Sequence, residues 1–302
     1  MSDALNRESI IEDIYAFLNR VKNALRKVKI TTILAYIVGL TLGIIWILPI
    51  IGIIMVSIRP IDEVLNGWWR FDEFHLTLDN YIKALNHPTN PLSVGLLNSF
   101  LVAIPATILP IIIGAMAAYG FARYSFKMKT YLFIFIVILM AVPQQMVAIP
   151  LYLILVRLGL INHLIGLIIV HIAWGLSWII LFFRNYFSQL PIEIEEAARV
   201  DGASDIQIFF QIVLPVSIPA LLSVTALQFT WVWNDFFFAL LIIYSPNRYV
   251  ATQMLAFMKG RYLTPWGLLS AGAIMVMMVP VVIYLLLQQY YVKGMVGWVI
   301  KG

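Results

Sequence analysis

Six long apolar stretches, separated by shorter polar ones, dominate the pattern of hydrophobic and polar positions along this chain. Each stretch is long enough to form a helix that crosses a bilayer, which takes about 20 apolar residues. Several contain proline, and a membrane helix tolerates proline where neighbouring groups satisfy the freed carbonyl. The pattern therefore predicts an all-α membrane protein with six transmembrane helices. The predicted spans are 31–57, 96–121, 131–156, 161–183, 216–244 and 266–287.

The first 29 residues follow a different pattern. Apolar side chains such as Ile10, Ile14 and Phe17 recur at helical spacing, with basic residues among them. This is typical of an amphipathic helix that lies at a membrane surface. A helix packed against a soluble partner is the alternative, and the pattern does not choose between them. We expect two parts, a cytoplasmic amphipathic helix at 1–29 and a six-span domain at 30–302.

Composition narrows the function classes. The chain is 62% hydrophobic and 12% charged, and it has no cysteine, which excludes disulfides, thiolate metal sites and cysteine nucleophiles. It contains no Walker A pattern and no serine-nucleophile motif, and its four histidines lack metal-ligand spacing. We therefore expect no catalytic residue, no metal site and no enzyme activity. The scattered basic residues form no stripe that would suit a nucleic acid.

The distribution of basic residues predicts an orientation. With six spans, both termini lie on one side of the membrane. Of the 20 Lys and Arg residues, 13 lie in segments on the side of the termini and 7 lie in segments on the other side, although the loop at 245–265 runs against this bias. Cytoplasmic segments are enriched in Lys and Arg. We expect a multi-pass protein of the cell membrane with both termini in the cytoplasm.

One polar segment, residues 191–215, holds five of the 15 acidic residues. Pro191 suits the first turn of a helix, and the glutamates that follow it complement the positive end of the helix dipole. Gly202 suits the position just after a helix end, while Ser204 and Gln207 have the spacing of a capping box. We predict two short helices joined by a tight turn at Gly202. An ordinary connecting loop is the alternative.

A few polar residues fall inside the predicted spans. Asp235 should face protein or water, because a carboxylate that faces lipid is costly. With Trp233 and Asn234 it offers an aromatic face beside amide and carboxylate groups, which suits a sugar; a structural hydrogen bond to a neighbouring helix is the alternative. Gln144 is a weaker candidate for a pathway. For His171, a hydrogen bond to a neighbouring helix is a simpler explanation than a pathway.

The polar segment resembles the EAA motif of ABC importer permeases. Glu196-Ala197-Ala198 is followed, at the spacing of that motif, by Gly202, Ile212 and Leu214-Pro215. Other segments resemble the carbohydrate branch of these permeases, and the nearest likeness is to the maltose-type second permease subunit. Those segments are 199–205, Asn98-Ser99, 117–123, 149–152, 233–236, 266–269 and the tail from Tyr291.

The resemblance implies the type I ABC importer permease fold and a set of partners. These are a second homologous permease, two ATPase subunits that bind ATP and Mg²⁺, an extracellular sugar-binding protein and membrane lipid. This chain itself would hold no cofactor. In the family the EAA helix docks in a cleft of the ATPase and transmits its closure to the spans. The residues implied in this coupling are Glu196, Ala197, Ala198, Arg199, Asp201 and Gly202.

The working hypothesis is therefore a transmembrane permease subunit of an ABC importer for a mono- or oligosaccharide. Residues 245–265 resemble the outer loop that approaches the binding protein. In some relatives only the partner permease holds the sugar within the membrane. One alternative is an importer for another solute, such as an amino acid, phosphate or peptide. A second is a channel or ion-coupled transporter with Asp235 as its ion site.

Overall fold

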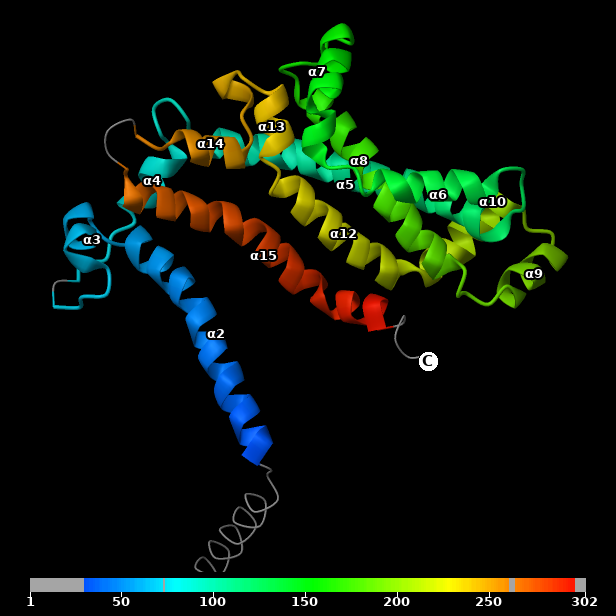
Figure 1. Cartoon of the computed structure of the whole chain (residues 1–302), viewed down its shortest axis with the longest axis horizontal. Helices are drawn as coiled ribbons and strands as arrows, with labels where there is room; N and C mark the ends of the chain where they lie inside the picture. Colours follow the sequence, from blue (N-terminus) through cyan, green and yellow to red (C-terminus); the bar gives the residue numbers. More distant parts are fainter. Residues whose placement is uncertain (1–29, 73, 261–263, 297–302) are drawn as a thin grey trace, which may run out of the picture. The chain divides into compact units, whose positions relative to one another are not determined.

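The computed structural model describes residues 30–72, 74–260 and 264–296, and this part of the chain is helical, without a strand (Figure 1). The amphipathic helix predicted at 1–29 lies outside the described residues. The helical elements are, in chain order, α2 (Ile30–Ser57), α3 (Ile61–Gly67), α4 (Asp79–Leu85), α5 (Leu92–Arg123), α6 (Lys129–Leu139), η1 (Gln144–Val147), α7 (Ala148–Arg157), α8 (Leu164–Phe187), α9 (Glu193–Val200), α10 (Asp205–Ile208), η2 (Phe209–Val213), α11 (Leu214–Val216), α12 (Ile218–Trp233), α13 (Phe237–Ile242), η3 (Pro246–Arg248), α14 (Ala251–Phe257) and α15 (Trp266–Val296).

Four helices are long and apolar enough to cross a membrane alone, namely α2, α5, α8 and α15. They coincide with the first, second, fourth and sixth predicted spans. Two pairs of helices pass the same test together but bend at a short break, by 98° between α6 and the η1–α7 segment and by 76° between the α10–α11 segment and α12. If each bent pair is one span, the total is six, which agrees with the predicted number.

The chain divides after Met55 into two compact units. Nearly all of α2 belongs to the first unit, and its side chains up to Ile50 are exposed wherever they are described. An apolar helix with no buried stripe is suited to contact with lipid or with another chain. All the sites described below belong to the second unit.

The fifth predicted span is not one helix. A single helix over 216–244 was expected, but α12 ends at Trp233 and a separate helix, α13, follows. The carboxylate of Asp235 accepts hydrogen bonds from the amides of Phe238 (3.2 Å) and Ala239 (2.9 Å). Those amides lie at the start of α13, where a helix has no internal acceptor for them. The Asp235 carboxylate therefore caps the start of α13.

The most extensive contact between helices joins α5 and α8, which lie side by side (Figure 1). Ala115 and Ala118 are fully buried, and a Cβ on Gly114 would lie 2.6 Å from Cγ2 of Ile179. Small residues allow membrane helices to approach closely and gain van der Waals contact. The small-residue run at 114–120 thus packs α5 against α8.

Helix α12 packs against both α5 and α15 and compensates for a proline in α5. Pro110 has no N–H, so the carbonyl of Ala106 lacks its helical donor. The side-chain amide of Gln228 donates a hydrogen bond to that carbonyl (3.1 Å). A Cβ on Gly175 of α8 would lie 2.6 Å from the same amide nitrogen, so glycine there leaves room for Gln228.

Candidate functional site

The polar segment forms the predicted helix, turn and helix. Gly202 follows α9 with a φ of +89°, in the left-handed region that favours glycine. Its N–H donates to the carbonyl of Arg199 (3.0 Å), and the N–H of Ala203 donates to the carbonyl of Ala198 (3.0 Å). These two bonds form a Schellman motif, which satisfies the last carbonyls of a helix. The predicted turn at Gly202 is confirmed.

The second helix begins with the predicted capping box. The N–H of Gln207 donates to Oγ of Ser204 (3.4 Å), and the Gln207 side chain accepts from the N–H of Ser204 (2.8 Å). Nη2 of Arg199 lies 3.2 Å from Oδ1 of Asp205 and links the two helices across the turn. The hydrogen bond to Asp205 raises the pKa of the Arg199 guanidinium above its ordinary value. The turn therefore holds a defined angle.

A buried ion pair attaches α9 to the end of α5. Glu195 is only 2% exposed and accepts hydrogen bonds from the hydroxyl of Tyr119 (2.8 Å) and from Nε of Arg123 (2.7 Å). Nη2 of Arg123 also donates to the carbonyl of Leu190 (3.0 Å), just before α9. Sequence reasoning counted Glu195 only as a helix-dipole residue. Its partner Arg123 is the last residue of α5, and sequence reasoning did not connect the two.

The opposite face of the segment is exposed within the described part of the chain. Among the predicted coupling residues, Glu196, Ala197, Arg199, Asp201 and Gly202 are exposed, and Ala198 is half-buried. Two apolar side chains on the same segment are unusually exposed, Val200 at 88% and Ile206 at 72%. Exposed apolar groups rimmed by charged ones are typical of an interaction surface. We call the segment from α9 to α10 the coupling element.

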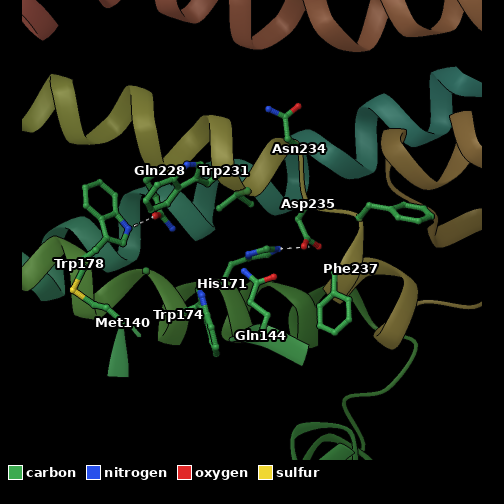
Figure 2. Close-up of a pocket in the computed structure, with 13 residues that line it drawn as sticks. Met140, Gln144, His171, Trp174, Trp178, Gln228, Trp231, Asn234, Asp235 and Phe237 are labelled. Carbon is green, nitrogen blue, oxygen red and sulfur yellow. Dashed lines mark hydrogen bonds and ion pairs between the residues drawn. The ribbon is translucent and has the colours of Figure 1, made fainter. Parts of the chain in front are cut away.

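A second feature is a cavity of about 530 Å³ between α8, α12 and the start of η1 (Figure 2). Three predicted pathway residues, Gln144, Asn234 and Asp235, line it. Figure 2 shows the side chains of His171 and Asp235 facing one another with Gln144 beside them, while Asn234 points away from this group. The full lining is Met140, Gln144, His171, Trp174, Gly175, Trp178, Gln228, Trp231, Val232, Asn234, Asp235, Phe236 and Phe237.

Trp233, the fourth predicted pathway residue, does not line the cavity. It is 1% exposed, its ring stacks on Phe229, and its indole N–H donates to the carbonyl of Val276 (3.0 Å). The aromatic group that sequence reasoning assigned to the pathway is therefore part of the packing between α12 and α15. A tryptophan next to polar residues in sequence points elsewhere because successive helix positions are about 100° apart.

The aromatic lining comes instead from Trp174, Trp178 and Trp231, which sequence reasoning missed. The indole N–H of Trp178 donates to Oε1 of Gln228 (2.9 Å). His171, Trp174 and Trp178 are spaced by three and four residues on α8, so they share one helix face. That spacing was a readable signal in the fourth span.

The outer segment predicted as a loop at 245–265 is partly a folded cap. It contains α14, and residues 261–263 lie outside the described part. Nδ2 of Asn98, on α5, donates to the carbonyls of Asn247 (3.1 Å) and Tyr249 (2.9 Å). Oγ of Ser99 accepts from the N–H of Ala251 (2.8 Å). Polar side chains within a span thus hold this segment against α5.

The interpretation of Asp235 as an ion site gains no support from the geometry. Both carboxylate oxygens already accept main-chain N–H groups, as described above. Nε2 of His171 lies 3.5 Å from Oδ2 of Asp235. Within the described residues, no group of three or more His, Cys, Asp or Glu side chains is placed to hold a metal ion.

Comparisons with known proteins identify the family of this chain. Residues 110–297 match the family model described as binding-protein-dependent transport system inner membrane component. A probable ABC transporter permease of Pyrococcus horikoshii is 55% identical over 265 residues, which cover 88% of this chain and 96% of that protein. A trehalose/maltose transport system permease of Thermococcus litoralis is 32% identical over 279 residues, which cover 92% of this chain and 100% of that protein.

A solved structure confirms the predicted fold. It is that of a bacterial ABC transporter involved in the import of the acidic polysaccharide alginate, with a TM-score of 0.74 and 23% identity. The match covers 86% of this chain and 96% of that chain. The family match spans more than half of the sequence and includes the coupling element and α12. This chain therefore belongs to the family of binding-protein-dependent transport system inner membrane components, and it is a multi-pass permease of the ABC transporter type.

Proposed function

We propose that this chain is the transmembrane subunit of an ABC importer for a mono- or oligosaccharide. The observation that carries the proposal is the coupling element, which is anchored on one face by the buried Glu195–Arg123 pair and left exposed on the other. The nature of the relatives supports the substrate class, since one is named for trehalose and maltose and the structural neighbour imports alginate. Both termini would lie in the cytoplasm.

The partners follow from the same surface. The exposed face of α9, which includes Val200, would dock against an ATPase subunit. That subunit, rather than this chain, would bind ATP and Mg²⁺. A pair of ATPase subunits calls for a second permease beside this one. An extracellular sugar-binding protein would deliver the substrate, as the description of the family as binding-protein-dependent indicates.

The mechanism would be alternating access. Closure of the ATPase pair would displace the coupling element, and the buried bonds from Glu195 to Tyr119 and Arg123 would carry that displacement into α5. The rigid turn at Gly202 would prevent the element from absorbing the movement itself. Interfaces of this kind convert small shifts into rearrangements between packed helices.

The test is uptake by the reconstituted importer. This chain would be co-expressed with its second permease, ATPase pair and binding protein, and placed in proteoliposomes with internal ATP. We expect ATP-dependent uptake of radiolabelled maltose or trehalose. Gly202→Val should abolish uptake, because valine is strained at a φ of +89°. The matched control is Gly159→Val, where the φ is +66° and open space also surrounds the new Cβ, but which lies outside the coupling element.

Three results would count against the proposal or a part of it. Uptake of an amino acid, phosphate or peptide with no uptake of any saccharide would identify an importer for another solute. Ion conductance from this chain alone, without an ATPase, would identify a channel or an ion-coupled transporter. Uptake that survives Gly202→Val at the wild-type rate would refute the coupling role while leaving the substrate class standing.

A further inference from the structure

The cavity between α8 and α12 combines two kinds of surface. One part of its lining is polar, with Gln144, His171 and Asp235 close together, and the other is aromatic, with Trp174, Trp178 and Trp231 (Figure 2). Its volume of about 530 Å³ lies within the range of about 300–1,000 Å³ that is usual for small-molecule sites. A mainly apolar site with a few converging polar groups is the usual form of a ligand site.

One buried polar atom in this lining makes no hydrogen bond to any described residue. His171 is 6% exposed, and its Nε2 atom is buried and makes no hydrogen bond among the described residues. The nearest acceptor is Oδ2 of Asp235 at 3.5 Å, which is beyond the usual length of such a bond. Buried polar atoms are nearly always hydrogen-bonded, so an unpartnered one at a cavity wall points to a ligand or water there.

The tryptophans present ring surface to the cavity. The N–H of Trp178 is already bonded to Gln228, so this side chain offers its ring. Trp231 packs edge-on against Trp178, with ring centroids 5.1 Å apart, and remains 58% exposed. Trp174 packs edge-on against Phe238 at 5.5 Å. Rings held in place in this way bind a ligand at low cost in conformational entropy.

We propose that this cavity is a binding site for a neutral saccharide, so that this chain holds substrate itself. The C–H faces of a sugar ring would pack on the indole of Trp231. A hydroxyl group would occupy the space beside His171 Nε2 and Asp235 Oδ2, since a hydroxyl both donates and accepts hydrogen bonds. The side-chain amide of Gln144 would bind a second hydroxyl. This inference rests on the proposed function.

The charge of the lining selects a neutral sugar. Among the described lining residues there is no Lys or Arg, and Asp235 is a carboxylate. A sugar acid would bring a second carboxylate near Asp235 without an arginine or lysine to pair with it, which is costly in a site of low dielectric. The site therefore differs in expected specificity from a transporter of an acidic polysaccharide.

The first experiment measures how tightly saccharides bind to the membrane complex in the absence of the extracellular binding protein. The purified membrane complex of both permeases and the ATPase pair would be titrated with maltose, trehalose and digalacturonate. We expect Gln144→Ala to weaken binding of the neutral disaccharide about three- to tenfold, the loss expected for one ligand hydrogen bond. The matched control is Gln145→Ala, because the neighbouring glutamine is exposed and lies outside the cavity lining. Digalacturonate should bind more weakly than maltose and trehalose.

The second experiment tests the aromatic wall by uptake. With saturating binding protein, Trp231→Ala should change the ratio of uptake rates for maltose and trehalose. Trp231→Phe should keep this ratio close to the wild-type value, because a ring face remains. Trp266→Ala, which removes an indole that is 54% exposed at the start of α15, should leave the ratio unchanged. This ratio can be measured even where direct binding is too weak to titrate.

The outcomes separate the two proposals. If the wild-type importer takes up no saccharide, the proposed function fails. If it takes up a saccharide but the Gln144 and Trp231 variants match wild type in both binding and uptake ratio, the sugar is held by the second permease and this inference is wrong. If digalacturonate binds as well as maltose does, the assignment of a neutral ligand is wrong.

Discussion

Trp233 donates its indole N–H to the main-chain carbonyl of Val276 (3.0 Å), which is the carbonyl that Pro280 leaves without a helical donor. Val276 and Pro280 are four positions apart, the spacing of a helical hydrogen bond. In the same way, Gln228 donates a hydrogen bond to the carbonyl of Ala106, which Pro110 leaves without a helical donor. Helix α12 thus supplies two side-chain donors that allow its neighbours α5 and α15 to contain proline.

We predict that Trp233→Phe destabilises the protein by about 0.5–2 kcal/mol, because it leaves the Val276 carbonyl unsatisfied in a nonpolar environment. The loss should be smaller in a Pro280→Ala background, since alanine provides the helical N–H that proline lacks. A double-mutant cycle on detergent-solubilised protein, followed by unfolding in SDS, measures this coupling. Equal losses in the two backgrounds would show that the indole contributes only packing.

We predict that Glu195→Ala loosens α9 from α5. The substitution leaves the buried guanidinium of Arg123 without its partner, a change that costs about 3–5 kcal/mol for a buried pair. Amide hydrogen exchange in α9 should become faster while exchange in α8 stays the same. Glu193→Ala is the control, because Glu193 is an exposed glutamate of the same helix. Unchanged protection in the Glu195 variant would mean that other contacts hold α9 in place.

We predict that Val200→Asp prevents stable association with the ATPase pair. Val200 is 88% exposed, so the substitution should change the stability of the isolated chain by less than about 0.5 kcal/mol. In a docked complex the carboxylate would be desolvated against the ATPase, and the fraction that copurifies should fall at least about tenfold. Val200→Thr, which keeps the shape of the side chain, should retain most of the association. Normal copurification of the Asp variant would place the docking face elsewhere.

We predict that Asn98→Leu releases the cap formed by η3 and α14. The substitution removes two hydrogen bonds and leaves the carbonyls of Asn247 and Tyr249 unsatisfied, at a cost of about 1–3 kcal/mol for each carbonyl that is not rehydrated. Limited proteolysis within 245–260 should become faster, while the α9–α10 region should keep its wild-type cleavage rate. Uniform cleavage across the chain would instead indicate global unfolding.

Local signals in the sequence predicted the part of the fold that depends on neighbouring residues. Hydropathy located the spans because each one contains a long, mainly apolar run. The turn at Gly202 and the capping box at Ser204 were predicted because their hydrogen bonds join residues at most five positions apart. The resemblance to the EAA motif implies a coupling role for this segment, and that role stays a prediction.

Contacts between distant residues could not be predicted in this way. Glu195 and Arg123 are 72 positions apart, and nothing in either local pattern reveals that they meet. The division between α12 and α13 was missed because hydropathy shows one apolar run here. It does not show that the Asp235 carboxylate accepts hydrogen bonds from main-chain amides within that run. The orientation of Trp233 toward α15 likewise depends on helix packing, which placed other tryptophans at the cavity.

Helix α5 is attached at both of its ends. Near its start, Asn98 and Ser99 hold the cap formed by η3 and α14, and near its end, Tyr119 and Arg123 hold the coupling element. Its 32 residues form one continuous helix of about 48 Å at 1.5 Å per residue. A continuous helix held in this way connects the two segments directly, so under the proposed mechanism a displacement of the coupling element would reach the cap formed by η3 and α14 through a single helix.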